Sequence, residues 1–407
     1  MKTRYIALGL MVALSASMYA QDKEADYRRS SIYSLMINHT DQQFAKEIKE
    51  AFLSIPVPDK FNDHNLSVKV VNMDKKLEGA KKEQENPVIT EFLKDNKVAS
   101  RLVGRWFNRD YFTGKCDMEL VKERGLYNAT EFDKQLATRS ARGMALLQDA
   151  GEDLIGNTFV LVNDIRYVDK NKGAKAVGGF LKILGAVASA YTGSSSYNDL
   201  GNNLGNIAET FKGFAVKINT FLYKLEWNDE LAGEFYQEQY AAEENATKRQ
   251  NFENARGKYT LKYVGKVESS GSKTSFLGIK EDEPVVMVRK ACQRAIDENV
   301  VDLQHDYEEF RIKTPLLSVE PLTAYIGMKE GVNAKSKYEV LEVVEMENGT
   351  RKYNRVGVIE PIPGLIWDNR YMAEEEGAVG ATLGFTTFRK VSGKDFAKGM
   401  LIKEMDK

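Results

Sequence analysis

The sequence predicts an α/β protein of the α+β kind, in which a mixed sheet with packed helices is followed by a small C-terminal all-β domain. The first observation is the alternation of strand-like and helical segments between residues 30 and 310. The second is a change, from Leu322 onward, to short strands punctuated by glycine with little helix. Hydrophobic residues make up 43% and charged residues 29%, which is ordinary for a folded protein and too apolar for a disordered one.

The N-terminus has the features of a secretory signal peptide at residues 1–20. Lys2 and Arg4 precede a short apolar run, and small residues lead up to a cleavage site after Ala20. The run is too short to span a bilayer comfortably, although a retained anchor helix is the alternative interpretation. We therefore expect export to the periplasm or the outer-membrane periphery, with an α/β domain at 21–320 and a β-rich domain at 321–407.

The first half of the α/β domain is predicted from the spacing of its apolar residues. Strands are expected at 32–37 and 66–70, with a helix between them that begins at a capping box of Thr40 and Gln43. Asn86-Pro87 opens a helix that runs to about Lys94, because the fixed φ of proline suits the first helical turn. The run 98–107 is predicted as a strand.

The second half begins with helices at 118–124 and from Thr130 onward. Residues 158–168 form the clearest strand, and 213–227 are its expected antiparallel neighbour. The alternation of apolar residues changes phase near Asn219, which predicts either a bulge or a strand covered on both faces. The remaining elements are a helix at 230–254, a strand at 259–267 and a helix at 284–305.

The C-terminal domain is predicted from its turn signals. Residues 337–360 are expected to form a hairpin that turns at Asn348-Gly349, because this dipeptide tolerates the positive φ of a type I′ turn. Residues 384–391 supply another strand. The boundary with the α/β domain is placed near Ser318 to Pro321.

An insertion at 173–206 connects the two long strands, where a hairpin needs only about two to five residues. Its first half is rich in small and apolar residues and carries few charges. Three interpretations stay open: a helix packed on its own domain, a contact with another protein copy or partner, and a contact with a membrane surface. The residues expected to make such a partner or membrane contact are Phe180, Leu181, Ile183, Leu184 and Val187.

The chain has two cysteines, Cys116 and Cys292. Export permits a disulfide between them, which would close a long loop. Cys292 also falls on one helical stripe with Val288 and Ile296, where a free cysteine acts as a small buried apolar residue. The sequence supports both interpretations equally.

No catalytic motif is found, and we expect no catalytic, cofactor or metal site. His305 lies near Asp302 and Asp306, which would suit base catalysis, but a histidine at the negative end of its helix is the better interpretation. Residues 368–370 with 374–376 offer oxygen ligands for calcium, and a solvated acidic loop is favoured over that site.

The balance of charge limits the classes of partner. There are 58 Lys and Arg against 59 Asp and Glu, so binding to nucleic acid has no general electrostatic support. We expect a secreted envelope protein that acts by binding, as a scaffold or in assembly, with a protein partner or a second copy of itself. The alternative from another class is a hydrolase whose paired carboxylates only the fold can bring together.

Two resemblances follow from particular segments. The signal ending at Ala20-Gln21, together with 326–331 and 367–371, resembles uncharacterised secreted envelope proteins of Bacteroides-type bacteria. The order of elements around Glu123-Arg124-Gly125 and the paired strands with their insertion is more distantly similar to the curli-secretion lipoprotein family. That similarity implies an outer-membrane-associated ring that uses the inserted segment. The chain departs from that family because it has no lipid-anchor cysteine near the cleavage site, and because its insertion does not alternate like a barrel strand.

Overall fold

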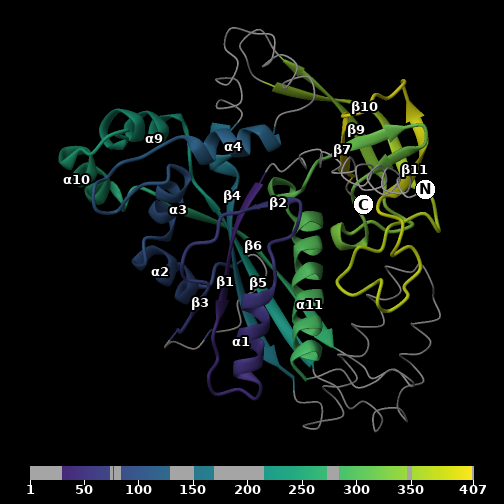
Figure 1. Cartoon of the computed structure of the whole chain (residues 1–407), viewed down its shortest axis with the longest axis horizontal. Helices are drawn as coiled ribbons and strands as arrows, with labels where there is room; N and C mark the ends of the chain where they lie inside the picture. Colours follow the sequence, from purple (N-terminus) through teal and green to yellow (C-terminus); the bar gives the residue numbers. More distant parts are fainter. Residues whose placement is uncertain are drawn as a thin grey trace, which may run out of the picture.

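The architecture was analysed in a computed structural model that describes residues 30–73, 77, 84–128, 151–168, 215–272, 284–345 and 351–405. It confirms the predicted α+β class. A mixed sheet lies between two groups of helices, and an all-β region follows toward the C-terminus (Figure 1).

The sheet is built around β1 (Ser30–Ile37), which pairs in parallel with three strands. These strands are β2 (Phe61–Asp63), β3 (Val70–Val71) and β4 (Thr158–Tyr167). β5 (Ala215–Leu225) pairs antiparallel with β4, and β6 (Leu261–Ser272) pairs antiparallel with β5. The order is therefore β2-β1-β4-β5-β6, with β3 attached to β1 beside β2. The predicted pairing of the two long strands is confirmed.

Helices cover both faces of the sheet (Figure 1). One face carries α1 (Ala45–Ser54) and α11 (Pro284–Asp306). The other face carries α2 (Pro87–Asp95), α3 (Val98–Trp106), α4 (Glu119–Asn128), α9 (Asp229–Glu234) with the π-helical turn Phe235–Gln239, and α10 (Ala246–Ala255).

β5 shows why the apolar alternation changed phase in the sequence. Val216, Ile218 and Leu222 face the layer of α1 and α11, whereas Phe221 and Tyr223 face the layer of α2 and α3. The strand is thus covered on both faces, as one of the two interpretations required. The register shift against β6 lies between Leu222 and Tyr223 rather than at Asn219.

The C-terminal region is a closed antiparallel barrel in the order β10-β11-β8-β7-β12-β9. The predicted hairpin is confirmed as β9–β10, although residues 346–350 at its turn lie outside the described residues. β7 begins at Thr314 and includes Ser318 and Val319, and Glu320 with Pro321 forms the turn to β8, so the barrel strands start before the expected boundary. The strands are β7 (Thr314–Val319), β8 (Leu322–Ala324), β9 (Tyr338–Glu345), β10 (Arg351–Pro361), β11 (Thr386–Gly393) and β12 (Leu401–Glu404).

Three local predictions were wrong. The single helix expected at 230–254 is divided, because residues 240–245 between the π-helical turn and α10 are not helical. Residues 98–107 were expected to form a strand, but Val98–Trp106 is the helix α3, because Val98, Leu102, Val103 and Trp106 are buried at helical spacing. At α1 the N-cap is Phe44, in a left-handed conformation, so Thr40 and Gln43 lie ahead of the helix instead of capping it.

Candidate functional site

A cleft of about 470 Å³ opens between α3 and α10, on the face of the sheet opposite α11. Its walls come from α3, the loop after α3, α10 and the loop before β3. The lining residues are Leu66, Ser67, Ser100, Arg101, Gly104, Arg105, Asn108, Arg109, Tyr111, Phe252, Glu253 and Arg256. Four arginines therefore share this cleft with one carboxylate, and the lining is strongly positive.

Arg101 and Arg105 form the wall supplied by α3. Residues four positions apart lie one above the other on a helix, so both side chains are on the same face. Within the part of the chain that the structure describes, neither guanidinium makes a hydrogen bond or an ion pair. Two neighbouring positive charges without a counter-charge repel each other, and a bound anion would relieve that repulsion.

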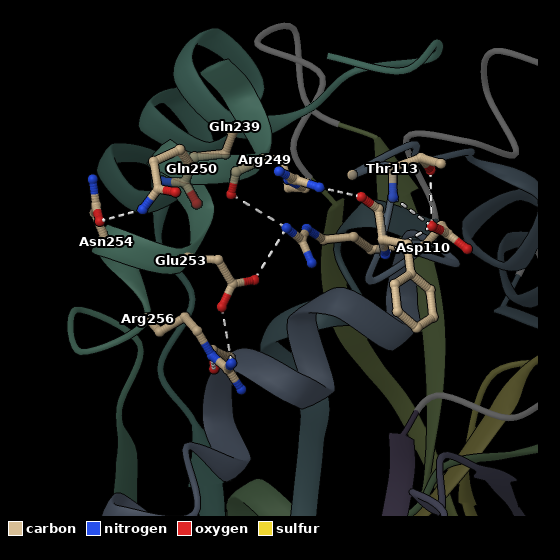
Figure 2. Close-up of polar contacts among 12 residues, drawn as sticks. Asp110, Thr113, Gln239, Arg249, Gln250, Glu253, Asn254 and Arg256 are labelled. Carbon is tan, nitrogen blue, oxygen red and sulfur yellow. Dashed lines mark hydrogen bonds and ion pairs between the residues drawn. The ribbon is translucent and has the colours of Figure 1, made fainter. Parts of the chain in front are cut away.

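On the opposite wall, the arginines are paired with a carboxylate. Arg109 and Arg256 hold the carboxylate of Glu253 from both sides, at 3.2 and 3.0 Å, as Figure 2 shows for Glu253 and Arg256. Arg256 also donates from Nε to the hydroxyl of Ser100 at 3.1 Å, and the Arg109 guanidinium lies 4.1 Å above the ring of Phe252. These contacts fix the shape of the cleft, and among the described residues they leave Arg101 and Arg105 as its charges without a partner.

A buried network holds α3 against the sheet. Trp106 Nε1 donates to Thr158 Oγ1 at 2.8 Å, and His64 Nε2 lies 2.9 Å from the carbonyl oxygen of Leu102. Arg124, on α4, donates to His64 Nδ1 at 2.6 Å and lies above the Trp106 ring. Burial, and next the charge of Arg105, lower the pKa of Arg124 to about 9.

The loop after α3 forms the rim of the cleft. The carboxylate of Asp110 accepts hydrogen bonds from the backbone N–H groups of Phe112 and Thr113, at 2.9 and 2.7 Å. It also accepts one from the Thr113 hydroxyl, and these bonds to Thr113 are the main cause of the lowered pKa of Asp110 (Figure 2). Arg249 of α10 donates to the carbonyl oxygen of Phe112, which ties the rim to the opposite wall.

A second polar pair lies where β1 and β4 end. His39 Nε2 is 2.5 Å from Asp164 Oδ1, and the same oxygen accepts a hydrogen bond from Arg166. Burial alone would raise the pKa of Asp164, but the hydrogen bond from His39 and the charge of Arg166 outweigh it and lower the pKa. Among the described contacts of this pair there is no hydroxyl or thiol that could act as a nucleophile.

The structure separates the residues that the sequence singled out. The insertion 173–206, with Phe180, Leu181, Ile183, Leu184 and Val187, lies outside the described residues. His305 Nε2 lies 2.7 Å from Glu404 Oε2, a partner from β12 that local spacing could not reveal. Asp368 binds Arg370 through both oxygens, and Glu376 pairs with Lys290 and Arg294 of α11.

The disulfide interpretation is wrong, because Cys116 and Cys292 are both free and buried. Cys116 belongs to the core on the α3 side of the sheet, and Cys292 belongs to the core between the sheet and α11. The alternative interpretation of Cys292, a small buried residue on an apolar helical stripe, is the one observed.

The described residues show neither a metal site nor a membrane-spanning helix, and comparison with known proteins gives no family. Among the described residues, no group of three or more His, Cys, Asp or Glu side chains is arranged to hold a metal ion. The described helices also include none whose length and apolar character would let it cross a membrane. No protein-family model and no curated protein matches this chain.

The arginine cleft was missed at the sequence level. Its signal was present in the spacing of Arg101 and Arg105, but it becomes visible only when 98–106 is recognised as a helix. Arg109, Glu253 and Arg256 come from segments far apart in the chain, and only the packing of α3 against α10 brings them together.

Proposed function

We propose that this chain is an exported protein of the bacterial cell envelope that acts by binding, and that the cleft between α3 and α10 receives an anionic ligand. The observation that carries the proposal is the pair Arg101 and Arg105, two guanidinium groups on one wall without partners among the described residues. Export rests on the signal-peptide features of residues 1–20.

The chemistry of the wall suits an oxyanion. A guanidinium presents planar, paired N–H donors that match two oxygens of a phosphate or a carboxylate. Because α3 is held by its buried network, Arg101 and Arg105 are placed in advance, and binding need not order the backbone. A volume of about 470 Å³ is in the range of small-molecule sites.

The lining as a whole favours binding over catalysis. Glu253 is the one carboxylate of the lining, and it is already engaged in ion pairs with Arg109 and Arg256. The other polar lining residues, Ser67, Ser100 and Asn108, can donate hydrogen bonds to a ligand, and Ser100 already accepts one from Arg256.

The test is a calorimetric titration of the chain with inorganic phosphate at low ionic strength. Replacing both arginines, Arg101→Gln and Arg105→Gln, should weaken binding by about tenfold or more, since charge-assisted hydrogen bonds contribute about 1.5–3 kcal/mol each. Added salt should weaken the binding of the unmodified chain in the same direction.

The matched control is Arg389→Gln on β11, which removes one exposed positive charge far along the chain from the cleft. It should leave phosphate binding unchanged. If the control weakens binding as much as the double substitution does, the effect is one of net charge, and the cleft is not the site.

A further inference from the structure

Two large aromatic side chains stand exposed at the tip of the rim. Tyr111 and Phe112 have exposed fractions of 67% and 75%. Their rings meet edge to face, with centroids 5.4 Å apart. Adjacent aromatic rings that are exposed together at a loop tip are unusual on a folded protein, because the apolar surface they leave in water is unfavourable.

The loop holds this tip rigidly. The Asp110 carboxylate accepts hydrogen bonds from the backbone N–H groups of Phe112 and Thr113, and Arg249 donates to the carbonyl oxygen of Phe112. The backbone N–H of Gly114 also donates to the carbonyl oxygen of Asp110, at 3.0 Å. Gly114 has a φ of 74°, and a Cβ there would come within 2.6 Å of Arg249 Cβ, so the loop closes tightly on α10. The aromatic rings are therefore presented by a fixed turn.

The tip and the unpaired arginines belong to one opening. Tyr111 lines the cleft together with Arg101 and Arg105, while Phe112 is the next residue outward along the turn. Aromatic side chains prefer the boundary between lipid chains and headgroups, and arginines beside them attract anionic headgroups. A ligand that satisfies both features has an apolar layer directly beside a phosphate.

We infer that the anion received by the cleft is the phosphate of an anionic phospholipid at a membrane surface, with Tyr111 and Phe112 inserted beside the headgroup. This inference rests on the proposed anion site and names the source of its ligand. A soluble phosphate would engage Arg101 and Arg105 equally well but would leave the aromatic tip in water. The exposed tip, together with the charge of the cleft, is what selects a lipid surface.

The experiment uses the full chain and two kinds of vesicle, phosphatidylcholine alone and phosphatidylcholine with phosphatidylglycerol, in a sedimentation assay. The unmodified chain should sediment with the anionic vesicles only. The substitution Phe112→Ser, at a side chain outside the lining of the cleft, should weaken that binding by about tenfold and leave the calorimetric titration with inorganic phosphate unchanged. The arginine double substitution should weaken both.

Val379→Ser is the matched control, because Val379 is an apolar side chain with an exposed fraction of 83% outside the cleft. It should bind vesicles as the unmodified chain does. A second readout is Phe112→Trp, whose fluorescence should shift to shorter wavelength on addition of anionic vesicles.

The outcomes separate the two proposals. If the chain binds phosphate but not anionic vesicles, or if the Phe112→Ser variant binds vesicles normally, the lipid inference is overturned and the anion site stands. If neither phosphate nor vesicles bind, both proposals fall. An unshifted Phe112→Trp emission in the presence of bound vesicles also contradicts the insertion of the tip.

Discussion

Asp297 is a buried carboxyl group on α11, where this helix meets the β-barrel region. Its Oδ2 atom accepts no hydrogen bond from the described residues. Burial raises the pKa of Asp297 from its ordinary 3.8 to about 7. Lys329 and Arg294 act in the opposite direction, and Glu330 and Asp59 add to the increase. Between pH 3.8 and about 7, the folded protein therefore holds a proton at Asp297 that the unfolded chain has lost.

This residue makes stability depend on pH. Because the pKa is raised in the folded state, protonated Asp297 contributes to the free energy of unfolding. This contribution is fully present below pH 3.8 and is lost as pH rises through about 7. Asp297→Asn keeps the neutral shape at every pH, so the variant should gain stability over the unmodified chain at pH 8, by about 1 kcal/mol or more, with a smaller difference at pH 5. Urea unfolding at the two pH values measures this difference.

The comparison between variant and unmodified chain is needed because Glu298 and Glu330 also have raised pKa values through burial and act in the same direction. These two residues give the free energy of unfolding a slope with pH in both proteins. An identical slope in the two proteins would show that Asp297 titrates as an ordinary exposed carboxylate.

At the scale of elements, α3 determines whether the site exists at all. As a strand, 98–107 would place Arg101 and Arg105 on the same face as Val103, and two charges would share a face with a core residue. As a helix, the segment buries Leu102, Val103 and Trp106 and turns both arginines toward the cleft. The valines and aromatic residues have a local preference for a strand. The helix forms nevertheless, because it buries Leu102, Val103 and Trp106 against the sheet.

Gly104 gives a direct test of α3. It lies inside the helix, and a Cβ there would meet Arg109 Cβ at 3.8 Å and the Phe252 ring at 3.9 Å, which is ordinary contact. Gly104→Ala should stabilise the protein by about 0.5–1 kcal/mol, because alanine restricts the unfolded chain. Urea unfolding measures the gain, and phosphate binding should persist because the methyl group leaves Arg101 and Arg105 unobstructed. A loss of stability on this substitution would contradict the helix packing described here.

Elements with strong local signals were predictable. Asn86 caps α2 through hydrogen bonds from Val88 and Ile89, as the Asn-Pro pair indicated, and α11 begins at Pro284 as expected. Two short strands were not predictable. β2 has no alternating pattern, and β3 keeps only Val70 of the predicted 66–70 and adds Val71. Both depend on pairing with β1, which is a long-range contact invisible to local periodicity.

At the scale of the whole molecule, the sheet separates two apolar cores, and each core holds one cysteine. Burial raises the pKa of both thiols, to about 12 for Cys292, so both should be unreactive as well as covered. Exposure of Cys116 reports opening of the α3 side, and exposure of Cys292 reports opening between the sheet and α11.

Thiol labelling should therefore follow global unfolding. The native chain should take up no alkylating reagent, and the chain unfolded in denaturant without reductant should take up one group on each cysteine, measured as intact mass. An unchanged mass after denaturation would mean that Cys116 and Cys292 are bonded. Labelling of one cysteine well before the other would mean that the two cores open independently.

The site itself is a product of the whole fold. α3 supplies Arg101 and Arg105, and α10 supplies the opposite wall, while the sheet beneath them fixes their separation. The sequence indicated a binding protein without a catalytic motif, but the place of binding required the tertiary structure. The described residues form the cleft, whereas the insertion 173–206, for which the sequence predicted a contact surface, lies outside them.

A crystal of the chain soaked in tungstate, a heavy oxyanion located by its anomalous scattering, would show the position of a bound anion itself. We predict an anomalous peak in the cleft, within hydrogen-bond distance of both Arg101 and Arg105. A cleft without a peak, in a crystal where the cleft is open to solvent, would contradict the assignment of this site to an anionic ligand.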